Sequence, residues 1–239
     1  MKKKIRILGI IPARSGSKGI KKKNMVTLGG YPLIYYTFRE AKKSALLTDV
    51  VVSTDSKEIA DCAKEAGICV PFLRPEELAQ DETPTVEVVL HCLNNYKQQQ
   101  SYPFDLAVIL QPTSPLRIAD DIDGAIRLLL EHQEANSVIS CYEGTSVHPR
   151  IMYIREEQKG TPLLAHHTSI PRQQFKEVYV RNGAVYGVTV SYLMKAKQLI
   201  GQLPCLYVMP RERSVNIDSS DDLVIAEAFL KKRKDYEKD

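Results

Sequence analysis

The sequence contains no tryptophan, only five cysteines and no apolar run near the ~20 residues that a membrane-spanning helix needs. The last of these absences predicts that the chain does not cross a membrane. The short apolar stretch behind the basic N-terminus leads into Pro12, Ala13 and Arg14 rather than a small-residue cleavage site, so we expect no signal peptide. The cysteines are odd in number and form no Cys-x-x-Cys pair, which argues against disulfides or zinc and favours the reducing cytoplasm.

Neither sign of charge is in large excess. The 239 residues include 33 Lys and Arg against 29 Asp and Glu, a formal net charge of +4, which is too small to indicate a nucleic-acid partner. Hydrophobic residues make up 44% and charged residues 26% of the chain, the proportions of a globular protein. A disordered chain and a coiled-coil rod are therefore excluded, and the length fits one large domain or two small ones.

Apolar runs and helical patterns alternate along most of the chain. Strand-like runs occupy residues 5–11, 49–55, 105–110 and 137–141. Helical patterns follow them at residues 32–41, 56–66, 83–93 and 120–130. This alternation predicts an α/β fold with a parallel sheet and right-handed crossovers. The polar loops after the strands should then meet at the carboxyl edge of the sheet, where such folds bind ligands.

The alternation breaks between about residues 144 and 180, where glycines and prolines interrupt short strand-like pieces. It returns with apolar runs at 185–190 and 206–209 and a last helix at 220–232. We therefore expect a single domain over residues 1–239, with a small β-rich lobe inserted at about 144–180.

The loop at residues 14–19, Arg-Ser-Gly-Ser-Lys-Gly, directly follows the first strand. Its small residues let backbone N–H groups approach an anion, and Arg14 and Lys18 add positive charge. The spacing matches neither the Walker A motif nor the Gly-x-Gly-x-x-Gly dinucleotide motif. The loop therefore favours a polyphosphate such as a nucleoside triphosphate, with a flexible surface loop as the alternative. We expect the lysines at 21–23 to be solvated and to raise the local concentration of anions.

Asn216 and Asp218 are separated by one residue, so in an extended segment both side chains point to the same face. Oxygen atoms on one face can hold Mg²⁺, which takes a few protein ligands together with substrate phosphates. The segment also precedes a helix, and Asp218, Ser219 or Ser220 could be the N-cap. The spacing alone leaves both interpretations open.

A set of short motifs runs in order along residues 5–230. The motifs are Ile-Pro-Ala-Arg-x-x-Ser-Lys-Gly at 11–19, Lys-Asn at 23–24, Val-Ser-Thr-Asp at 52–55, Leu-Arg-Pro-x-x-Leu-Ala at 73–79, Leu-Gln-Pro-Thr-Ser-Pro-Leu-Arg at 110–117, Pro-Arg-Gln-Gln at 171–174, Arg-Asn-Gly-Ala-x-Tyr at 181–186 and Ile-Asp at 217–218. In order and spacing the set resembles the CMP-sialic acid synthetases, also called acylneuraminate cytidylyltransferases.

This resemblance implies a Rossmann-like nucleotidyltransferase fold, with a mostly parallel central sheet flanked by helices. It also implies a cytidylyltransferase that moves CMP from CTP to the anomeric hydroxyl of a nonulosonic acid, such as N-acetylneuraminate, and releases pyrophosphate. The family uses Mg²⁺ and forms homodimers in which the inserted lobe reaches into the partner's sugar site. We expect no nucleic-acid or membrane partner.

The resemblance also assigns roles to matching positions. The expected nucleotide-binding residues are Arg14, Ser17, Lys18, Asn24, Arg74, Asp81 and Thr83. The expected sugar-binding residues are Gln111, Thr113, Ser114, Arg172, Asn182 and Tyr186. The expected catalytic residues are Arg14 and Lys18, which would stabilise the departing pyrophosphate, and Asp218, which would hold the metal.

The sequence departs from the family pattern at Asn216, where an aspartate is usual. An amide offers a carbonyl oxygen without a negative charge, so we expect Asp218 to be the principal Mg²⁺ ligand and Asn216 a weaker one. Two alternatives stay open: a legionaminic or pseudaminic acid acceptor, and a non-catalytic nucleotide- or sugar-binding homologue. The opening loop disfavours an eight-carbon Kdo acceptor, and the Arg-Pro pair at 74–75 disfavours GTP.

Overall fold

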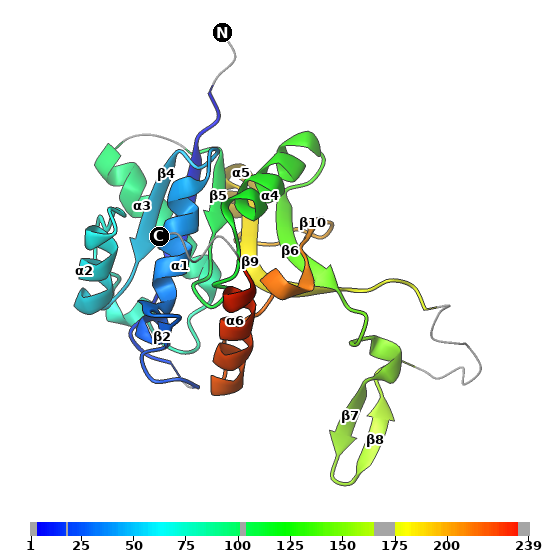
Figure 1. Ribbon diagram of the computed structural model, residues 1–239. Coiled ribbons are helices and arrows are strands. Elements are labelled where there is room, and N and C mark those ends of the chain that lie inside the picture. The colour runs from blue at the N-terminus through cyan, green and yellow to red at the C-terminus, as the bar shows by residue number, and fades with distance from the viewer. Residues whose placement is uncertain (1–3, 18, 101–103, 165–174, 234–239) are drawn as a thin grey trace.

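The computed structural model describes residues 4–17, 19–100, 104–164 and 175–233, and its centre is a six-stranded sheet (Figure 1). The strands are β1 (Ile7–Pro12), β4 (Asp49–Ser53), β5 (Leu106–Ile109), β6 (Ser137–Glu143), β9 (Tyr179–Thr189) and β10 (Cys205–Val208). They are ordered β10-β6-β9-β5-β1-β4 across the sheet. β9 runs antiparallel to β5 and β6, and the remaining neighbours are parallel.

Helices cover both faces of this sheet (Figure 1). α1 (Leu33–Lys43), α2 (Lys57–Glu65) and α4 (Ala119–Glu131) contribute to the apolar cluster on one face. α3 (Thr85–Gln100) and α5 (Val190–Ala196) contribute to the cluster on the other. A third cluster joins α6 (Ser220–Lys232) to the start of α1 and to Ile217. The result is a three-layer arrangement of helices, sheet and helices.

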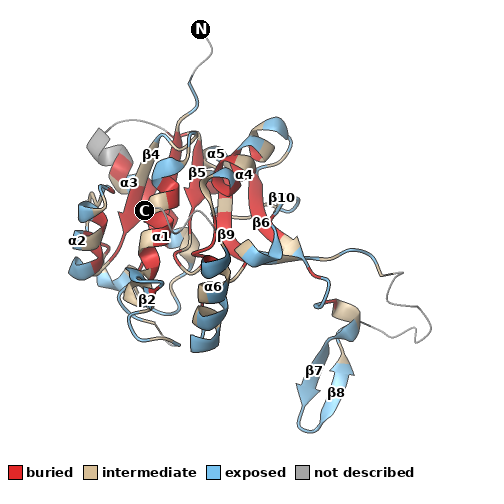
Figure 2. Cartoon of the chain, in the orientation of Figure 1, coloured by how far each residue is buried: buried red, intermediate tan, exposed pale blue. Residues whose placement is uncertain are grey.

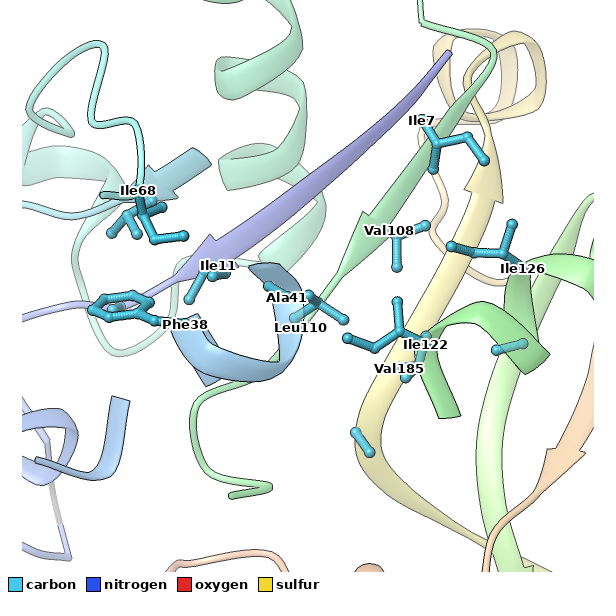
Figure 3. Close-up of a cluster of buried hydrophobic side chains, with 14 of the residues drawn as sticks. Ile7, Ile11, Phe38, Ala41, Ile68, Val108, Leu110, Ile122, Ile126 and Val185 are labelled. Carbon is cyan, nitrogen blue, oxygen red and sulfur yellow. The ribbon is translucent and has the colours of Figure 1, made fainter. Parts of the chain in front are cut away.

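The strands are buried on both faces, as Figure 2 shows for the centre of the sheet. In β1, Ile7 and Ile11 belong to the cluster with α1 and α4, whereas Leu8 and Ile10 belong to the cluster with α3. Figure 3 shows the first of these clusters, in which Ile11 and Phe38 belong to the same apolar layer. Burial on both faces explains why the strands have continuous apolar runs rather than an alternating pattern.

The predicted fold class, a mostly parallel α/β sheet flanked by helices, is confirmed. The main difference concerns β9, which is longer than the run predicted at 185–190 and is antiparallel. Its first half contains Arg181, Asn182 and Gly183, and this polar triplet hid the strand from a pattern based on apolar runs. The short helix α5 follows β9 directly and was not predicted.

The chain between β6 and β9 carries η3 (Pro149–Ile151), β7 (Tyr153–Glu156) and β8 (Lys159–Pro162). β7 and β8 form an antiparallel hairpin that lies apart from the sheet (Figure 1). All four residues of β7 are exposed, and Tyr153 and Ile154 are exposed by 58% and 52%. This hairpin lies within the range in which we expect the inserted lobe.

Shorter elements complete the chain near the carboxyl edge of the sheet. They are β2 (Thr27–Leu28), β3 (Tyr31–Pro32), and the 3₁₀ turns η1 (Lys23–Met25), η2 (Glu76–Leu78) and η5 (Arg211–Arg213). Within the described ranges, no helix is long and apolar enough to span a membrane.

Candidate active site

A cavity of about 350 Å³ lies beside the ends of β1 and β5. Its walls come from the loop after β1, the segment between β4 and α3, the loop after β5 and the segment before α6. The predicted site residues that line it are Arg14, Ser17, Asn24, Arg74, Asp81, Thr83, Gln111, Thr113, Asn216 and Asp218. Candidates for nucleotide, sugar and metal binding therefore share one cavity.

Two cation–carboxylate contacts join different walls of this cavity, and we call them the cavity ion pairs. Arg14 Nη2 lies 2.5 Å from Asp81 Oδ1, and both side chains are partly exposed. Lys23 Nζ lies 2.8 Å from Asp218 Oδ1. Each pair connects the loop after β1 to a segment that is distant in the sequence.

Lys23 corrects one expectation from the sequence, namely that the lysines at 21–23 are solvated. Its side chain is only 14% exposed, and Nζ donates to the carbonyl oxygen of Ile217 at 2.9 Å as well as to Asp218. Lys22, in contrast, is 61% exposed and pairs with Glu58 outside the cavity. In the sequence, the run of three lysines does not indicate which of them points into the cavity.

The loop after β1 is fixed through its backbone. Ser15 donates its N–H to Asp55 Oδ1 at 2.9 Å, and its hydroxyl donates to the same carboxylate. Asn24 Nδ2 donates to the carbonyl oxygen of Arg14 at 2.9 Å. At Gly19, a Cβ atom would lie 2.5 Å from the carbonyl oxygen of Asp218, so only glycine allows the loop to approach this segment. The backbone that carries Arg14 is therefore held from several directions.

Arg74 is buried at the base of the cavity, with 6% of its surface exposed. Nε donates to Ser53 Oγ at 3.0 Å, and Nη2 donates to the carbonyl oxygen of the same residue. Burial, partly offset by nearby acids, lowers the pKa of the guanidinium. These contacts fix the plane of the guanidinium at the end of β4.

Two predicted sugar-binding residues lie behind the cavity lining rather than in it. Ser114 Oγ donates to the carbonyl oxygen of Asn182 at 2.9 Å, and both residues are buried. The Asn182 amide accepts from Ser140 Oγ at 2.6 Å and donates to Ser214 Oγ at 2.9 Å. We call Ser114, Ser140, Asn182 and Ser214 the rear network. In this position Asn182 supports Gly183, whose backbone lies so close to Gln111 that an added Cβ atom would be 2.6 Å from Gln111 Oε1.

The other predicted residues are placed as follows. Tyr186 is partly buried against the apolar cluster of α3 and α5, and burial raises the pKa of its hydroxyl. Lys18 and Arg172 lie outside the described residues.

Arg117 is a supporting residue for which the sequence suggested no role. Its side chain is fully buried, with Nη1 donating to the carbonyl oxygen of Ala184 at 2.6 Å and Nη2 donating to Thr37 Oγ1 at 2.7 Å. A further bond reaches the carbonyl oxygen of Gln111 at 3.3 Å. Burial lowers the pKa of Arg117 to about 10, which still leaves it charged at neutral pH. Arg117 thus ties the loop after β5 to β9 and α1.

The segment before α6 has oxygen atoms suited to a metal ion. Ser219, not Asp218, caps α6 by accepting from the N–H of Asp222, so the Asp218 carboxylate is available for the cavity. Asn216 Nδ2 donates to Asp218 Oδ2, and Asn216 Oδ1 is buried without a hydrogen-bond partner. The described residues include no group of three or more His, Cys, Asp or Glu side chains placed to hold a metal. The two oxygen donors fit a cation that completes its shell with phosphates and water, as Mg²⁺ does.

Comparison with known proteins shows which chains this one is similar to. The chain is 31% identical to an N-acylneuraminate cytidylyltransferase of Escherichia coli O18:K1:H7 over 95% of its length, which spans about half (53%) of that relative. It is 32% identical to a CMP-N,N'-diacetyllegionaminic acid synthase of Legionella pneumophila, covering 95% of this chain and 97% of that one. The structure of a CMP:2-keto-3-deoxy-manno-octonic acid synthetase complexed with CTP has the same fold, with a TM-score of 0.69 at 14% identity, covering 95% of this chain and 99% of that chain. The family model described as cytidylyltransferase matches residues 8–189, and the chain belongs to this family.

Proposed function

We propose that the protein transfers CMP from CTP to the anomeric hydroxyl of a nonulosonic acid, N-acetylneuraminate or a close relative, and releases pyrophosphate. The observation that carries the proposal is the shared cavity at the strand ends. It brings Arg14, Arg74 and Lys23 together with Asp218 in a chain of the cytidylyltransferase family. Three cations and two acids around a cavity of about 350 Å³ suit a triphosphate and a metal better than a neutral ligand.

Phosphoryl transfer requires the protein to position charges rather than to form covalent bonds. We infer that Arg14 and Lys23 hold the triphosphate from two sides and stabilise the negative charge that grows on the departing pyrophosphate. Lys18 would add a third cation. Because contacts to Ser53 fix its orientation, the Arg74 guanidinium is suited to recognising the cytosine ring.

The cytidylyltransferase family generally uses a divalent metal, and we propose Mg²⁺ for this chain. Asp218 and Asn216 would hold it through carboxylate and amide oxygens. When bound, Mg²⁺ would neutralise phosphate charge and polarise the phosphoryl group under attack. Lys23 would exchange its contact with Asp218 for one with a phosphate oxygen.

For the sugar we propose Gln111 and Thr113 as direct contacts, because both line the cavity. Ser114 and Asn182 would position these residues from behind. Arg172 would pair with the sugar carboxylate, for which a planar guanidinium is well shaped. Tyr186 packs against the cluster of α3 and α5 and is not among the residues that line the cavity, so its contact with the sugar stays a prediction.

We further propose that residues 1–239 form one domain, that the lobe at about 144–180 serves dimerisation, and that two copies associate. The exposed apolar side chains of the hairpin support this role because monomers rarely leave such groups open. Ile154→Asp should then shift the dimer toward monomer in sedimentation velocity, whereas Leu203→Asp, at an 87% exposed position outside the lobe, should not. An unchanged dimer in Ile154→Asp would contradict the proposal. The cytoplasmic location stays a prediction.

A legionaminic acid acceptor is the second candidate. The Legionella relative named for that sugar matches this chain over nearly the whole length of both proteins. The E. coli relative named for N-acylneuraminate is equally similar, so identity does not rank the two sugars.

The deciding experiment incubates the full chain with CTP, Mg²⁺ and one sugar at a time, and measures pyrophosphate release and CMP-sugar formation. The panel consists of N-acetylneuraminate, N,N'-diacetyllegionaminate, pseudaminate and Kdo. Release with a nine-carbon sugar supports the proposal, and release with none, by a chain that binds CTP, indicates the non-catalytic homologue. Asp218→Ala should lose activity and keep its fold, because Ser219 caps the helix; Asp221→Ala is the matched control.

A further inference from the structure

The ion pair between Arg14 and Asp81 places a carboxylate on the side chain best suited to hold a phosphate. Arg14 belongs to the loop after β1, and Asp81 belongs to residues 79–84, between η2 and α3. Both residues line the cavity, and their side chains are 29% and 33% exposed. Carboxylate and phosphate oxygens compete for the same face of a guanidinium group.

The two partners are held very differently. The backbone of Arg14 is fixed by Asn24, and the adjacent Ser15 is fixed by Asp55. None of the residues from 79 to 84 is buried. Thr83 donates its N–H to the carbonyl oxygen of Gln80 and its hydroxyl to that of Glu77 in η2, at 3.3 Å each, so these bonds stay within residues 77–84. Asp81 can therefore leave Arg14 without disturbing the core, whereas Arg14 stays in place.

We propose that Asp81 is a built-in competitor for the phosphate groups of the nucleotide, pairing with Arg14 until a triphosphate displaces it and pairing again when pyrophosphate leaves. The proposal rests on the proposed function, because it takes the phosphate chain of CTP as the ligand of Arg14. Asp81 lowers the affinity for phosphate, and in return it keeps Arg14 oriented and speeds the release of the product. Direct contact between Asp81 and the base is a different role, and it predicts the opposite response to substitution.

The test is calorimetric titration of the full chain with inorganic tripolyphosphate and with CTP, both without metal. Asp81→Asn removes the charge and keeps the shape. Glu82→Gln is the matched control, because it removes the same charge from the neighbouring exposed residue, which does not line the cavity. We expect Asp81→Asn to bind tripolyphosphate about three- to fivefold more tightly, the upper part of the scale of a partly exposed ion pair. Glu82→Gln should stay within about twofold of the wild type, since surface charges at this distance are screened.

A double-mutant cycle assigns the gain to Arg14. In the Arg14→Ala background, Asp81→Asn should give no gain in tripolyphosphate affinity if the competition acts through this arginine. Pyrophosphate should also inhibit the Asp81→Asn enzyme at lower concentrations than it inhibits the wild type.

Unchanged or weaker tripolyphosphate binding by Asp81→Asn would overturn the competitor role. Loss of CTP affinity with unchanged tripolyphosphate affinity would overturn it in favour of base contact. A gain of the same size in the Arg14→Ala background would also overturn it. If the wild type bound neither ligand, the proposed function would fail together with this inference, whereas wild-type binding without a gain would remove the inference alone.

Discussion

The cavity ion pairs line the cavity, whereas the rear network lies behind its lining, and the two groups differ in what can replace their partners. Arg14, Lys23, Asp81 and Asp218 are paired but face a cavity, so a phosphate or a metal can replace either partner. The four residues of the rear network are buried behind the cavity lining, and their hydrogen bonds join them to one another. We infer that the first group supplies binding and chemistry, whereas the second supplies stability. Substitutions should separate the two functions.

We expect the largest effect, a loss of stability, from substitution of Arg117, which is buried behind the cavity lining. Arg117→Ala leaves the carbonyl oxygen of Ala184 and the hydroxyl of Thr37 without their donor in the interior. We expect the free energy of unfolding to fall by about 3–5 kcal/mol, because buried polar groups are costly when unpaired. Urea denaturation measures this change. Arg127→Ala, at a 57% exposed position on α4, is the control and should change stability by less than about 0.5 kcal/mol. A loss below about 1 kcal/mol at Arg117 would contradict the structural role.

In the cavity, Arg14→Ala should affect the reaction rather than the fold. We expect kcat to fall by about 10²-fold or more, the scale of losing one preorganised charge contact. The melting temperature should stay nearly unchanged, because the pairing of the Arg14 side chain with Asp81 lies in the cavity and not in the core. Lys22→Ala removes a charge from the same loop outside the cavity and should leave kcat nearly intact. Wild-type turnover in Arg14→Ala would refute the assigned role.

Gly183 lies between the two groups, so its substitution should affect both properties moderately. Its φ of +74° disfavours any residue with a Cβ, and that atom would lie 2.6 Å from Gln111 Oε1. Gly183→Ala should cost about 1–2 kcal/mol of stability from the backbone alone and raise the KM for the sugar by displacing Gln111. Gly16→Ala, where a Cβ meets no atom within 4 Å, is the control for stability. Equal stability of both variants would be inconsistent with this account.

The smallest effect concerns Asp222, which positions Asp218 from α6. One oxygen of Asp222 accepts from the N–H groups of Asp218 and Ser219, at 3.0 and 2.8 Å. Burial opposes ionisation, but these bonds and that from the Ser219 hydroxyl outweigh it and lower the pKa of the carboxyl. Asp222→Ala should therefore cost about 1 kcal/mol at neutral pH, the usual value of a helix cap.

The pH dependence of this cost has a defined sign. A carboxyl whose pKa is lower in the folded state stabilises the fold above its ordinary pKa, and this contribution disappears as the pH falls through the folded value. The stability difference between wild type and Asp222→Ala should thus be complete at neutral pH and shrink below pH 3.8, the ordinary value of an aspartate. Asp221→Ala removes a charge from the same helical turn without these bonds. A difference that persists unchanged at low pH would show that the bonds to Asp222 are not responsible.

Much of the fold could be predicted because a strand that is buried on both faces of the sheet is a continuous apolar run in the sequence. The strands β1, β4 and β5 and the helices between them follow this rule, and the loops after them meet at one cavity. The rule fails at the start of β9, where Asn182 is buried by hydrogen bonds rather than by apolar contacts. Sequence patterns record hydrophobicity and not which polar groups pair across the chain.

The same limit applies to the site. Arg14, Asn24 and Asp218 lie in loops whose position follows from the strand order, so the sequence could place them together. Lys22 and Lys23 have the same side chain and differ in the direction in which it points. That direction is set by the backbone of the turn η1. Arg117 follows the loop after β5 and is enclosed by α1 and β9, so its burial depends on how three distant segments pack.

The pairing of β6 with β9 is irregular at one place, where residues 182–185 face Ser140 alone. Just beyond this bulge, Cys141 pairs with Arg181, and the two strands then lead out to the hairpin of β7 and β8. Only the pairs that join residues 141–143 to residues 179–181 separate the bulge from the end of the two strands. A displacement of these strand ends would therefore be passed on over three residue pairs to Asn182 and Gly183, and from Gly183 to Gln111 in the cavity lining.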